Sequence, residues 1–449
     1  MTKTISKSSF IRGTKCPKSL WLHFFQPQDR DEISEGQQNI FNTGHSVGAL
    51  AQQLFPGGID ASRREPGKVS EAVTYTQELI NNGQTVIYEA AFSDGETLCY
   101  MDILVKEKGE WRAYEVKAST SVKDYHIMDA AFQYYVITRS GLPLADIFLV
   151  HINNQYIRHG EIDVQQLFTF EPLTSTISLM QAGIPGQLLS LNQMLIAGVI
   201  PAIEMGAQCT SPFACDFIGF CQSSLPEEPE SSNQLPASRK QDHLDNFKSR
   251  LVCPLYFMDF ETIFPVIPLH DESRPYQQIP FQYSLHIVKD FNSMDKPAHH
   301  FFLGTPPSDP RPAFIESLLD RLGTHGSIIV WNATFEKTRL KEIARDFPEY
   351  SSRIEPLFDR LVDLMVPFRK KHLYTPDMNG SYSLKAVLPA LVPDLSYSNL
   401  EIQEGGSASL TYESLYYDTE QESIAKKRRD LLNYCELDTL SMVRILELL

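Results

Sequence analysis

The chain has 449 residues, more than one hydrophobic core usually supports, so two domains are expected. Its composition, with 42% hydrophobic and 21% charged residues, excludes a disordered chain, a collagen-like repeat and a small disulfide scaffold. The net charge of -16 argues against a protein that coats nucleic acid through bulk positive potential, although short basic runs at 369–371 and 426–429 remain available for local contacts.

No run of about 18 apolar residues occurs, and residues 1–10 lack the apolar segment of a secretory signal. We therefore expect no membrane span and a cytoplasmic location. The seven cysteines should then be mostly reduced, which favours metal binding over disulfides.

The N-terminal half contains three successive strand patterns, at 85–92, 97–107 and 110–119, joined by glycine-containing turns. They predict a short antiparallel meander. Residues 122–139 have apolar side chains at helical intervals without Gly or Pro, which predicts a helix packed behind these strands.

Asp102, Glu115 and Lys117 fall on the second and third of these strands, and Glu115 and Lys117 share a face. A surface hairpin with a Glu/Lys pair would give the same pattern. The spacing resembles the PD-(D/E)xK nuclease motif. That resemblance implies that Asp102 and Glu115 bind a divalent cation, while Lys117 orients the attacking water and stabilises developing charge.

Four further residues extend this resemblance to the RecB-like branch of these nucleases. His45 resembles the helical histidine that supplies a metal ligand, and Glu89 on the preceding strand could add a carboxylate. Gln133 and Tyr134 resemble the Gln-containing helix that contacts DNA and supports the site.

Cys16 precedes the nuclease motif, whereas Cys209, Cys215 and Cys221 follow it within thirteen residues of one another. This arrangement resembles the iron-sulfur RecB-like nucleases, including the AddB and CRISPR-associated types, and implies a 4Fe-4S cluster. Zn²⁺ is the lesser alternative, and buried cysteines without a ligand are the third. Core packing is expected of the other cysteines, Cys99, Cys253 and Cys435.

Residues 223–242 are rich in Pro, Ser and Glu and contain almost no large apolar side chains. We predict a linker at 223–250 between an N-terminal domain at 1–222 and a C-terminal domain at 251–449.

The C-terminal half begins with a nearly continuous apolar run at 255–262, which predicts a central strand buried on both faces. Strands are also predicted at 282–288 and 327–332, and helices at 335–347 and 423–449.

Asp259 and Glu261 are two residues apart on the first of these strands, so both project from one face. A pair facing solvent at a strand end is the simpler interpretation, and a divalent-cation site is the alternative. Later features favour the cation site, because Asn332 and Glu336 lie at a strand-to-helix junction and Tyr434 and Asp438 are four apart on the last helix.

Together these three motifs resemble those of DnaQ-like 3′-to-5′ exonucleases of the Tyr-containing (DEDDy) subclass. The resemblance implies that Asp259, Glu261, Glu336 and Asp438 hold two Mg²⁺ or Mn²⁺ ions and that Tyr434 orients or deprotonates the attacking water. Glu336 departs from the family, which has Asp there.

Neighbouring acidic and basic residues complete the C-terminal pattern. Asp359 or Asp363 could replace Glu336 as a ligand, and Asn332 is a candidate substrate contact. Lys385, in a segment that resembles the Ser-Leu-Lys element of this fold, would approach a phosphate or lie on an exposed helix start.

The resemblances imply an α/β (α+β) protein with an N-terminal PD-(D/E)xK restriction-endonuclease-like domain and a C-terminal RNase H-like mixed-sheet exonuclease domain, like bacterial fusions with a large domain of unassigned function. The expected activity is hydrolysis of nucleic acid, with DNA favoured over RNA as a single strand or free 3′ end. A nucleic-acid-binding scaffold with inactive sites and an RNA exonuclease are the alternatives.

Overall fold

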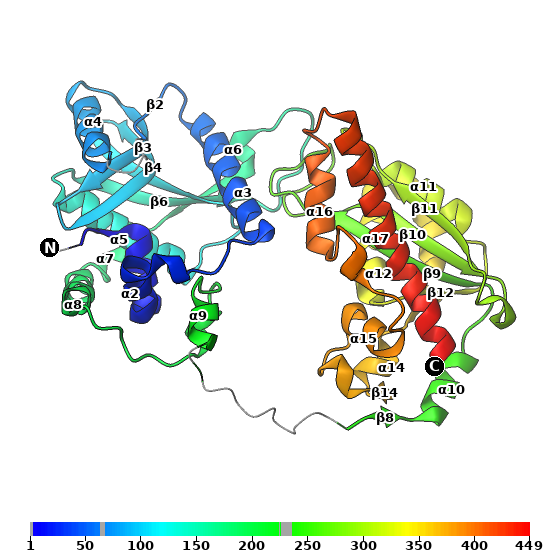
Figure 1. Cartoon of the computed structure of the whole chain (residues 1–449). Coiled ribbons are helices and arrows are strands. Elements are labelled where there is room, and N and C mark those ends of the chain that lie inside the picture. The colour runs from blue at the N-terminus through cyan, green and yellow to red at the C-terminus, as the bar shows by residue number, and fades with distance from the viewer. Residues whose placement is uncertain (1–2, 63–67, 224, 226–235) are drawn as a thin grey trace. The chain divides into compact units, whose positions relative to one another are not determined.

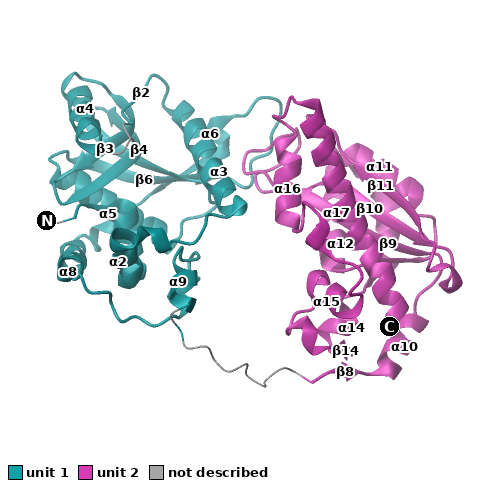
Figure 2. Ribbon diagram, viewed as in Figure 1, with its two compact units in different colours: residues 1–228 teal, residues 229–449 magenta. Residues whose placement is uncertain are grey.

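The computed structural model describes residues 3–62, 68–223, 225 and 236–449. Two compact units divide the chain, Met1–Glu228 and Pro229–Leu449 (Figure 2). Each combines helices with a mixed sheet, which confirms the α/β class. In the described ranges, no helix has the length and apolar character needed to cross a membrane.

The N-terminal unit is built on a seven-stranded sheet with the order β2-β3-β4-β5-β6-β7, and β1 pairs with β4. Its strands are β1 (Ile5–Ser6), β2 (Ile59–Asp60), β3 (Val86–Ser93), β4 (Thr97–Glu107), β5 (Glu110–Lys117), β6 (Leu144–Ile152) and β7 (Phe168–Pro172). The predicted meander is β3-β4-β5, and it forms the centre of this larger sheet. Strands β5 and β6 run parallel because helix α5 (Asp124–Arg139) crosses between them.

Helix α5 packs Ala130, Phe132 and Val136 into the core of this unit, as its apolar spacing predicts. Phe10 of the first helix stacks on Phe132, with ring centroids 4.6 Å apart. The other helices are α1 (Lys7–Lys15), α2 (Pro17–Phe25), α3 (Glu35–Ala51), α4 (Val69–Asn81), α6 (Val164–Leu167), α7 (Thr174–Ser178), α8 (Ile184–Ala197) and α9 (Ile218–Ser223).

The C-terminal unit has a five-stranded sheet with the order β11-β10-β9-β12-β13. Its strands are β9 (Leu255–Ile263), β10 (Ile279–Val288), β11 (Ala298–Leu303), β12 (Ser327–Val330) and β13 (Leu361–Asp363), and β8 (Ser238–Arg239) pairs separately with β14 (Leu373–Tyr374). Strands β9, β10 and β11 are antiparallel neighbours, whereas β12 runs parallel to both β9 and β13. The predicted burial of β9 is confirmed, since every side chain but that of Asp259 is buried.

Helices cover both faces of this sheet (Figure 1). One core joins the sheet to α11 (Arg311–Arg321) and α12 (Ala333–Asp346) through side chains such as Phe314 and Leu340. The other face carries α10 (Gln241–Ser249), α14 (Val366–Arg369), α15 (Leu384–Leu391), α16 (Gly405–Ser414) and the long α17 (Gln421–Leu448). The short α13 (Ser351–Ile354) follows α12.

The predicted linker at 223–250 is wrong at its C-terminal end. Residues 224 and 226–235 lie outside the described part of the chain, but residues 241–249 form α10. Leu244 and Phe247, three residues apart, bury one face of this helix in the core of the C-terminal unit. Their flanking polar residues gave this segment the composition of a linker.

Candidate functional site

Carboxylates from three elements meet in the C-terminal unit, as the sequence predicts. Asp259 and Glu261 project from the same face of β9, over which α17 brings Asp438. Burial raises the pKa of Asp259 well above its ordinary value, and the neighbouring charges of Asp438, Glu261 and Glu336 raise it further. Burial followed by the charge of Asp438 has the same effect on the pKa of Glu261. So concentrated a group of buried acids requires protons or cations to offset its charge.

Glu336 lies in the first turn of α12 and is 2% exposed. Burial raises its pKa to about 8, and the nearby charge of Asp363 contributes. Its Oε2 atom is buried and has no hydrogen-bond partner among the described residues. An unsatisfied buried carboxylate oxygen fits a metal ligand. Of the two aspartates considered as substitutes, Asp363 on β13 interacts with Glu336, whereas Asp359 ends a separate 3-10 turn.

Asp438 and Tyr434 occupy one face of α17, one turn apart. Burial raises the pKa of Asp438 to about 7, although a hydrogen bond from the hydroxyl of Tyr397 opposes the rise. Tyr434 is 4% exposed, and its pKa is raised by burial and by the charges of Asp438 and Glu261. The phenol therefore stays protonated beside the carboxylates, where it can hydrogen-bond a water.

Lys385 lies beside these tyrosines. Its ammonium is 5.2 Å from the ring centroid of Tyr434 and 5.6 Å from that of Tyr397, and it donates to the carbonyl oxygen of Gln403. Its positive charge opposes the rise that burial causes in the pKa of both Glu261 and Asp438. This position, at the start of α15, brings a cation close to the acidic centre.

Three residues at this centre were not predicted as site residues. Tyr397 lies in a short turn with no distinctive sequence pattern. Gly405 begins α16, and a Cβ atom added to it would lie 3.7 Å from the Glu261 Oε2 atom. Cys435 is buried, as predicted, but its sulfur lies 3.9 Å from the Asp259 Oδ2 atom. Ligand atoms of Asp259, Glu261 and Cys435 all lie within 4.8 Å of one another.

Asn332, the predicted substrate contact, is exposed at the N-cap position of α12. Its side chain makes no cap hydrogen bond to the start of this helix.

The N-terminal constellation is centred on Glu115, which is 1% exposed on β5. Its Oε1 atom accepts hydrogen bonds of 2.7 Å from both Lys7 and Lys117, and its Oε2 atom accepts one of 2.7 Å from Gln133. Burial favours the neutral acid, but the charges of Lys117 and Lys7 prevail and lower the pKa of Glu115. Glu115 is thus a buried, ionised carboxylate held by three donors.

Asp102 lies next to this carboxylate on β4 and accepts a 2.7 Å hydrogen bond from the Val116 N–H group. Burial raises the pKa of Asp102 to about 8, and the charges of Glu115 and Glu89 add to the rise. Glu89 has a φ of 53°, within the left-handed region, opposite the middle of β4. The structure therefore brings together Asp102, Glu115, Lys117, Glu89 and Gln133.

Lys7 and Asp129 are the members of this site that the sequence did not reveal. Lys7 starts α1 and lies 3.6 Å from the Asp129 Oδ2 atom, to which Lys117 also donates at 2.7 Å. Both lysines thus occupy the space among the carboxylates. Two predicted site residues lie elsewhere: Tyr134 is half-buried against the core, and His45 is exposed on α3 with no described bond to these acids.

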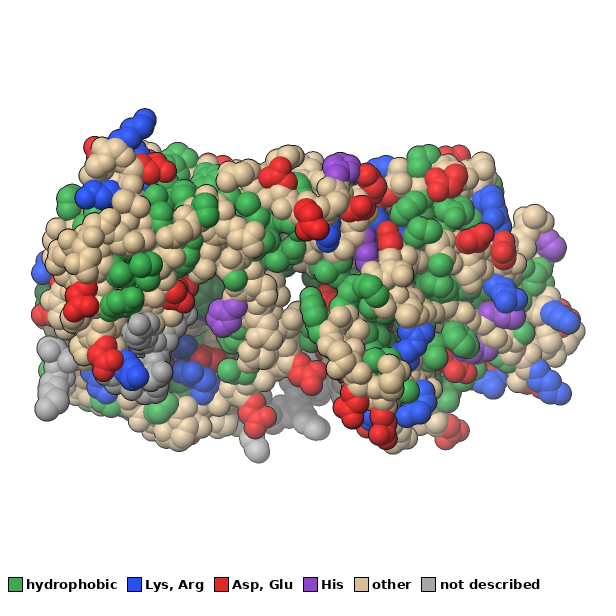
Figure 3. Space-filling view, turned by 90° about the horizontal axis from the view of Figure 1, so that it is seen from above, with side chains coloured by type: hydrophobic (Ala, Val, Ile, Leu, Met, Phe, Trp, Pro, Cys, Tyr) green, Lys and Arg blue, Asp and Glu red, His purple; other side chains and the backbone are tan. Residues whose placement is uncertain are grey.

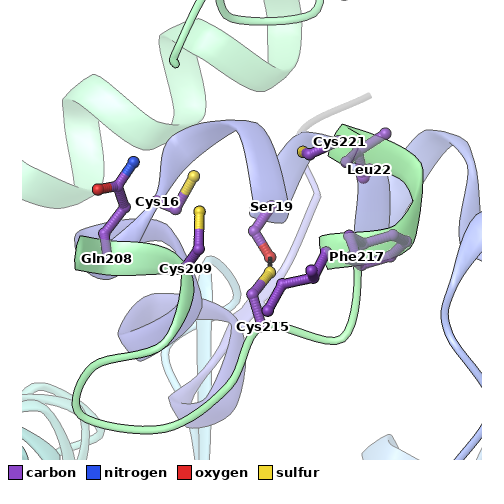
Figure 4. A pocket seen from close by; sticks show the side chains of 9 residues that line it. Cys16, Ser19, Leu22, Gln208, Cys209, Cys215, Phe217 and Cys221 are labelled. Carbon is purple, nitrogen blue, oxygen red and sulfur yellow. Dashed lines mark hydrogen bonds between the residues drawn. The ribbon is translucent and has the colours of Figure 1, made fainter. Parts of the chain in front are cut away.

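Cys16, Cys209, Cys215 and Cys221 line one pocket of the N-terminal unit together with Ser19 and Phe217 (Figure 4). Cys16 separates α1 from α2, and the other three come from residues 207–223. The Cys221 thiol interacts with those of Cys215 and Cys209, and the Cys215 thiol is 3.3 Å from the Ser19 hydroxyl. Segments nearly two hundred residues apart therefore meet at their thiols.

Thiolate sulfur binds both Zn²⁺ and iron-sulfur clusters, so the chemistry of these four cysteines fits either ligand. Nearby cations are also present, since Lys15 interacts with Cys215 and Cys209, and Lys18 with Cys221.

Comparison with known proteins identifies relatives of unassigned function. Residues 256–383 match the family described as "Domain of unknown function (DUF2779)". The chain is 30% identical over 208 residues to "Uncharacterized protein MG366 homolog" of Mycoplasma pneumoniae, covering 42% of this chain and 31% of that protein. It is 26% identical over 211 residues to "Uncharacterized protein UU173" of Ureaplasma parvum (42% and 30%) and 29% over 213 residues to "Uncharacterized protein MG366" of Mycoplasma genitalium (42% and 31%).

The chain therefore spans less than a third of the length of these curated relatives. The matched family segment contains Asp259, Glu261 and Glu336 but ends before Tyr434 and Asp438.

Proposed function

We propose that this protein is a metal-dependent nuclease whose C-terminal unit removes nucleotides from the 3′ end of DNA. The observation that carries the proposal is the convergence of Asp259, Glu261, Glu336 and Asp438, with Tyr434 among them. These are the residues that the resemblance to DnaQ-like exonucleases implies, and no two of the three motifs are neighbours in the sequence.

The sheet supports an RNase H-like fold for this unit. Three antiparallel strands, β9, β10 and β11, are followed by β12 and β13 parallel to β9, with β9 central. Helix α12 follows β12 directly, so Glu336 is positioned at a strand-to-helix junction beside the central strand. That arrangement is the one expected for the exonuclease class.

Each site residue has a role in such a reaction. The carboxylates fit divalent Mg²⁺ or Mn²⁺, which would lower the pKa of a water and stabilise the leaving 3′ oxygen. Tyr434 keeps its proton and orients the attacking water through its hydroxyl. Lys385 places a positive charge where the phosphate would approach, which offsets repulsion from the four acids.

Surface charge favours recognition of a strand end over broad contact with a duplex. On the face seen in Figure 3, the lysine and arginine side chains coloured there are scattered among acidic ones instead of forming a continuous strip. The basic run at 426–429 is also engaged within the protein, since Lys426 pairs with Asp430 and Lys427 with Asp418. A site that reads backbone and not bases should have weak sequence preference.

For the N-terminal unit we propose a PD-(D/E)xK nuclease stabilised by a 4Fe-4S cluster on Cys16, Cys209, Cys215 and Cys221. The pairing of Asp102 and Glu115 on adjacent strands, with Lys117 beside them and Gln133 on the crossover helix, supports it. A DNA-binding role without cutting is the second candidate, and one observation favours it: Lys7 occupies the position beside Glu115 that a cation would need.

The test is digestion of single-stranded DNA and RNA, labelled at either the 5′ or the 3′ end, by the purified full chain with Mn²⁺ or with EDTA. A 3′-to-5′ exonuclease yields a descending ladder from 5′-labelled DNA and immediate release of a labelled mononucleotide from the 3′-labelled strand. Intact strands at every Mn²⁺ concentration, together with binding that persists in EDTA, would identify a scaffold instead.

A further inference from the structure

A second cluster of metal-binding side chains lies in the C-terminal unit, apart from the carboxylate centre. His286 of β10 and His299 of β11 are directly opposite cross-strand neighbours. The Glu436 Oε1 atom, from α17, is 3.6 Å from the His299 Nδ1 atom. One ligand atom from each of these three residues lies within 4.8 Å of the others. Two imidazoles and a carboxylate thus converge from three elements.

Each imidazole ring is held by a hydrogen bond at one of its nitrogen atoms, which leaves the other nitrogen to bind a ligand. The His286 Nδ1 atom is 2.8 Å from the Thr439 hydroxyl, and the His299 Nε2 atom is 2.9 Å from the Ser284 hydroxyl. These two hydroxyls are 2.7 Å apart and complete a small network. The Nε2 atom of His286 and the Nδ1 atom of His299 are left for a ligand, as in metal-bound histidines whose second nitrogen bonds a protein group.

We propose that His286, His299 and Glu436 form a binding site for Zn²⁺ or a similar late first-row divalent cation. Imidazole nitrogens suit such cations, whereas Mg²⁺ prefers oxygen ligands, so the site differs in preference from the centre around Asp259. Three protein ligands leave a fourth position open for water. Access is available because the side chain of Glu436 is 46% exposed and that of His299 is 21% exposed.

A cation here would join the edge of the sheet to α17, the helix that carries Tyr434 and Asp438. His299 lies on β11 at the sheet edge, and Thr439, which holds His286, follows Asp438 on the same helix. Binding would therefore fix the position of α17 relative to β10 and β11. Binding of the cation at this site does not depend on the proposed nuclease activity.

The experiment is calorimetric titration of Zn²⁺ into the whole 449-residue chain, as purified and in excess Mg²⁺, for wild type and three variants. Glu436→Gln and His299→Ala each remove one ligand. His300→Ala is the matched control, because the next residue on β11 faces the other side of the sheet. Glu436 is a surface position, so its substitution leaves the fold intact.

Wild type and His300→Ala should each bind one Zn²⁺ ion with the same affinity. The affinity of Glu436→Gln and of His299→Ala for this ion should be at least tenfold weaker. With Co²⁺ the same site should give weak visible bands without intense thiolate absorption, which separates it from binding at cysteines. Equal Zn²⁺ affinity and stoichiometry in all four proteins would overturn the proposal. So would an equal loss in His300→Ala, because disturbance of the strand would then explain the effect.

Discussion

The hydroxyl of Tyr397 donates a hydrogen bond to the Oδ1 atom of Asp438, across 41 residues of sequence. This bond stabilises the ionised carboxylate, since it opposes the rise that burial causes in the pKa of Asp438. Asp438 must be ionised to hold a cation. Tyr397 therefore acts as a positioning residue for the proposed exonuclease site.

Tyr397→Phe should weaken Mn²⁺ activation by about tenfold, the effect of losing one hydrogen bond to a charged group. The acidic limb of the pH-activity profile should also move to higher pH, because Asp438 would bind its proton more tightly. Tyr417→Phe is the control, since Tyr417 is 81% exposed. An unchanged Mn²⁺ dependence and pH profile in Tyr397→Phe would show that the bond has no such role.

The buried carboxyl group of Glu336 should make the stability of the metal-free protein depend on pH. Its pKa is raised from 4.5 to about 8 by burial, so folding favours the protonated acid. Its contribution to the free energy of unfolding is complete below pH 4.5 and is lost as pH rises through about 8. In EDTA at pH 8, Glu336→Gln should raise the melting temperature of the C-terminal unit, on the order of 5 °C.

The gain from Glu336→Gln should shrink at pH 5, where wild-type Glu336 is already protonated, and Mn²⁺ should stabilise wild type more than the variant. A melting temperature that is the same for both proteins at pH 8 in EDTA would contradict the burial of an unpaired carboxyl group at this position.

The ammonium group of Lys7 should weaken metal binding by the N-terminal unit. Its ammonium is 2.7 Å from the Glu115 Oε1 atom and competes with a cation for that oxygen. Lys7→Met should strengthen Mn²⁺ binding to this unit by about tenfold, measured by titration in an Asp259→Ala background. Lys117→Ala should abolish cutting by this unit without the same gain in Mn²⁺ affinity. Unchanged Mn²⁺ affinity in Lys7→Met would mean that Glu115 is not a ligand.

Substitution of Cys16 tests the cluster, because Cys16 is the thiol that the N-terminal segment contributes to the pocket. Anaerobically purified protein should be brown, with absorbance near ~400 nm expected for thiolate-bound iron-sulfur clusters. Cys16→Ser should lose this colour and destabilise the N-terminal unit, whereas Cys253→Ser, at a residue outside the pocket, should keep it. Colourless wild-type protein with bound zinc would refute the 4Fe-4S assignment.

The sequence predicted those parts of the site that depend on local spacing. Asp259 and Glu261 share a strand face, and Tyr434 and Asp438 share a helix face. The side-chain periods of a strand and of a helix fix these directions. It could not predict Lys7 or Tyr397, which reach the sites from distant segments through tertiary packing, and it missed Asp129, which lies four residues before Gln133 on α5. The predicted C-terminal end of the linker was wrong for a related reason, since only packing reveals that Leu244 and Phe247 are buried.

The most direct test of the central claim compares Asp259→Ala and Tyr434→Phe in digestion of a 5′-labelled single strand with Mn²⁺. Both variants carry Lys117→Ala as well, so that only the C-terminal site is measured. Asp259→Ala should lose degradation and bind Mn²⁺ weakly. Tyr434→Phe should retain Mn²⁺ and DNA binding but turn over on the order of 10²-fold more slowly, because it lacks the hydroxyl that orients the water. Degradation at the wild-type rate by both variants would contradict the assignment of an exonuclease to the C-terminal unit.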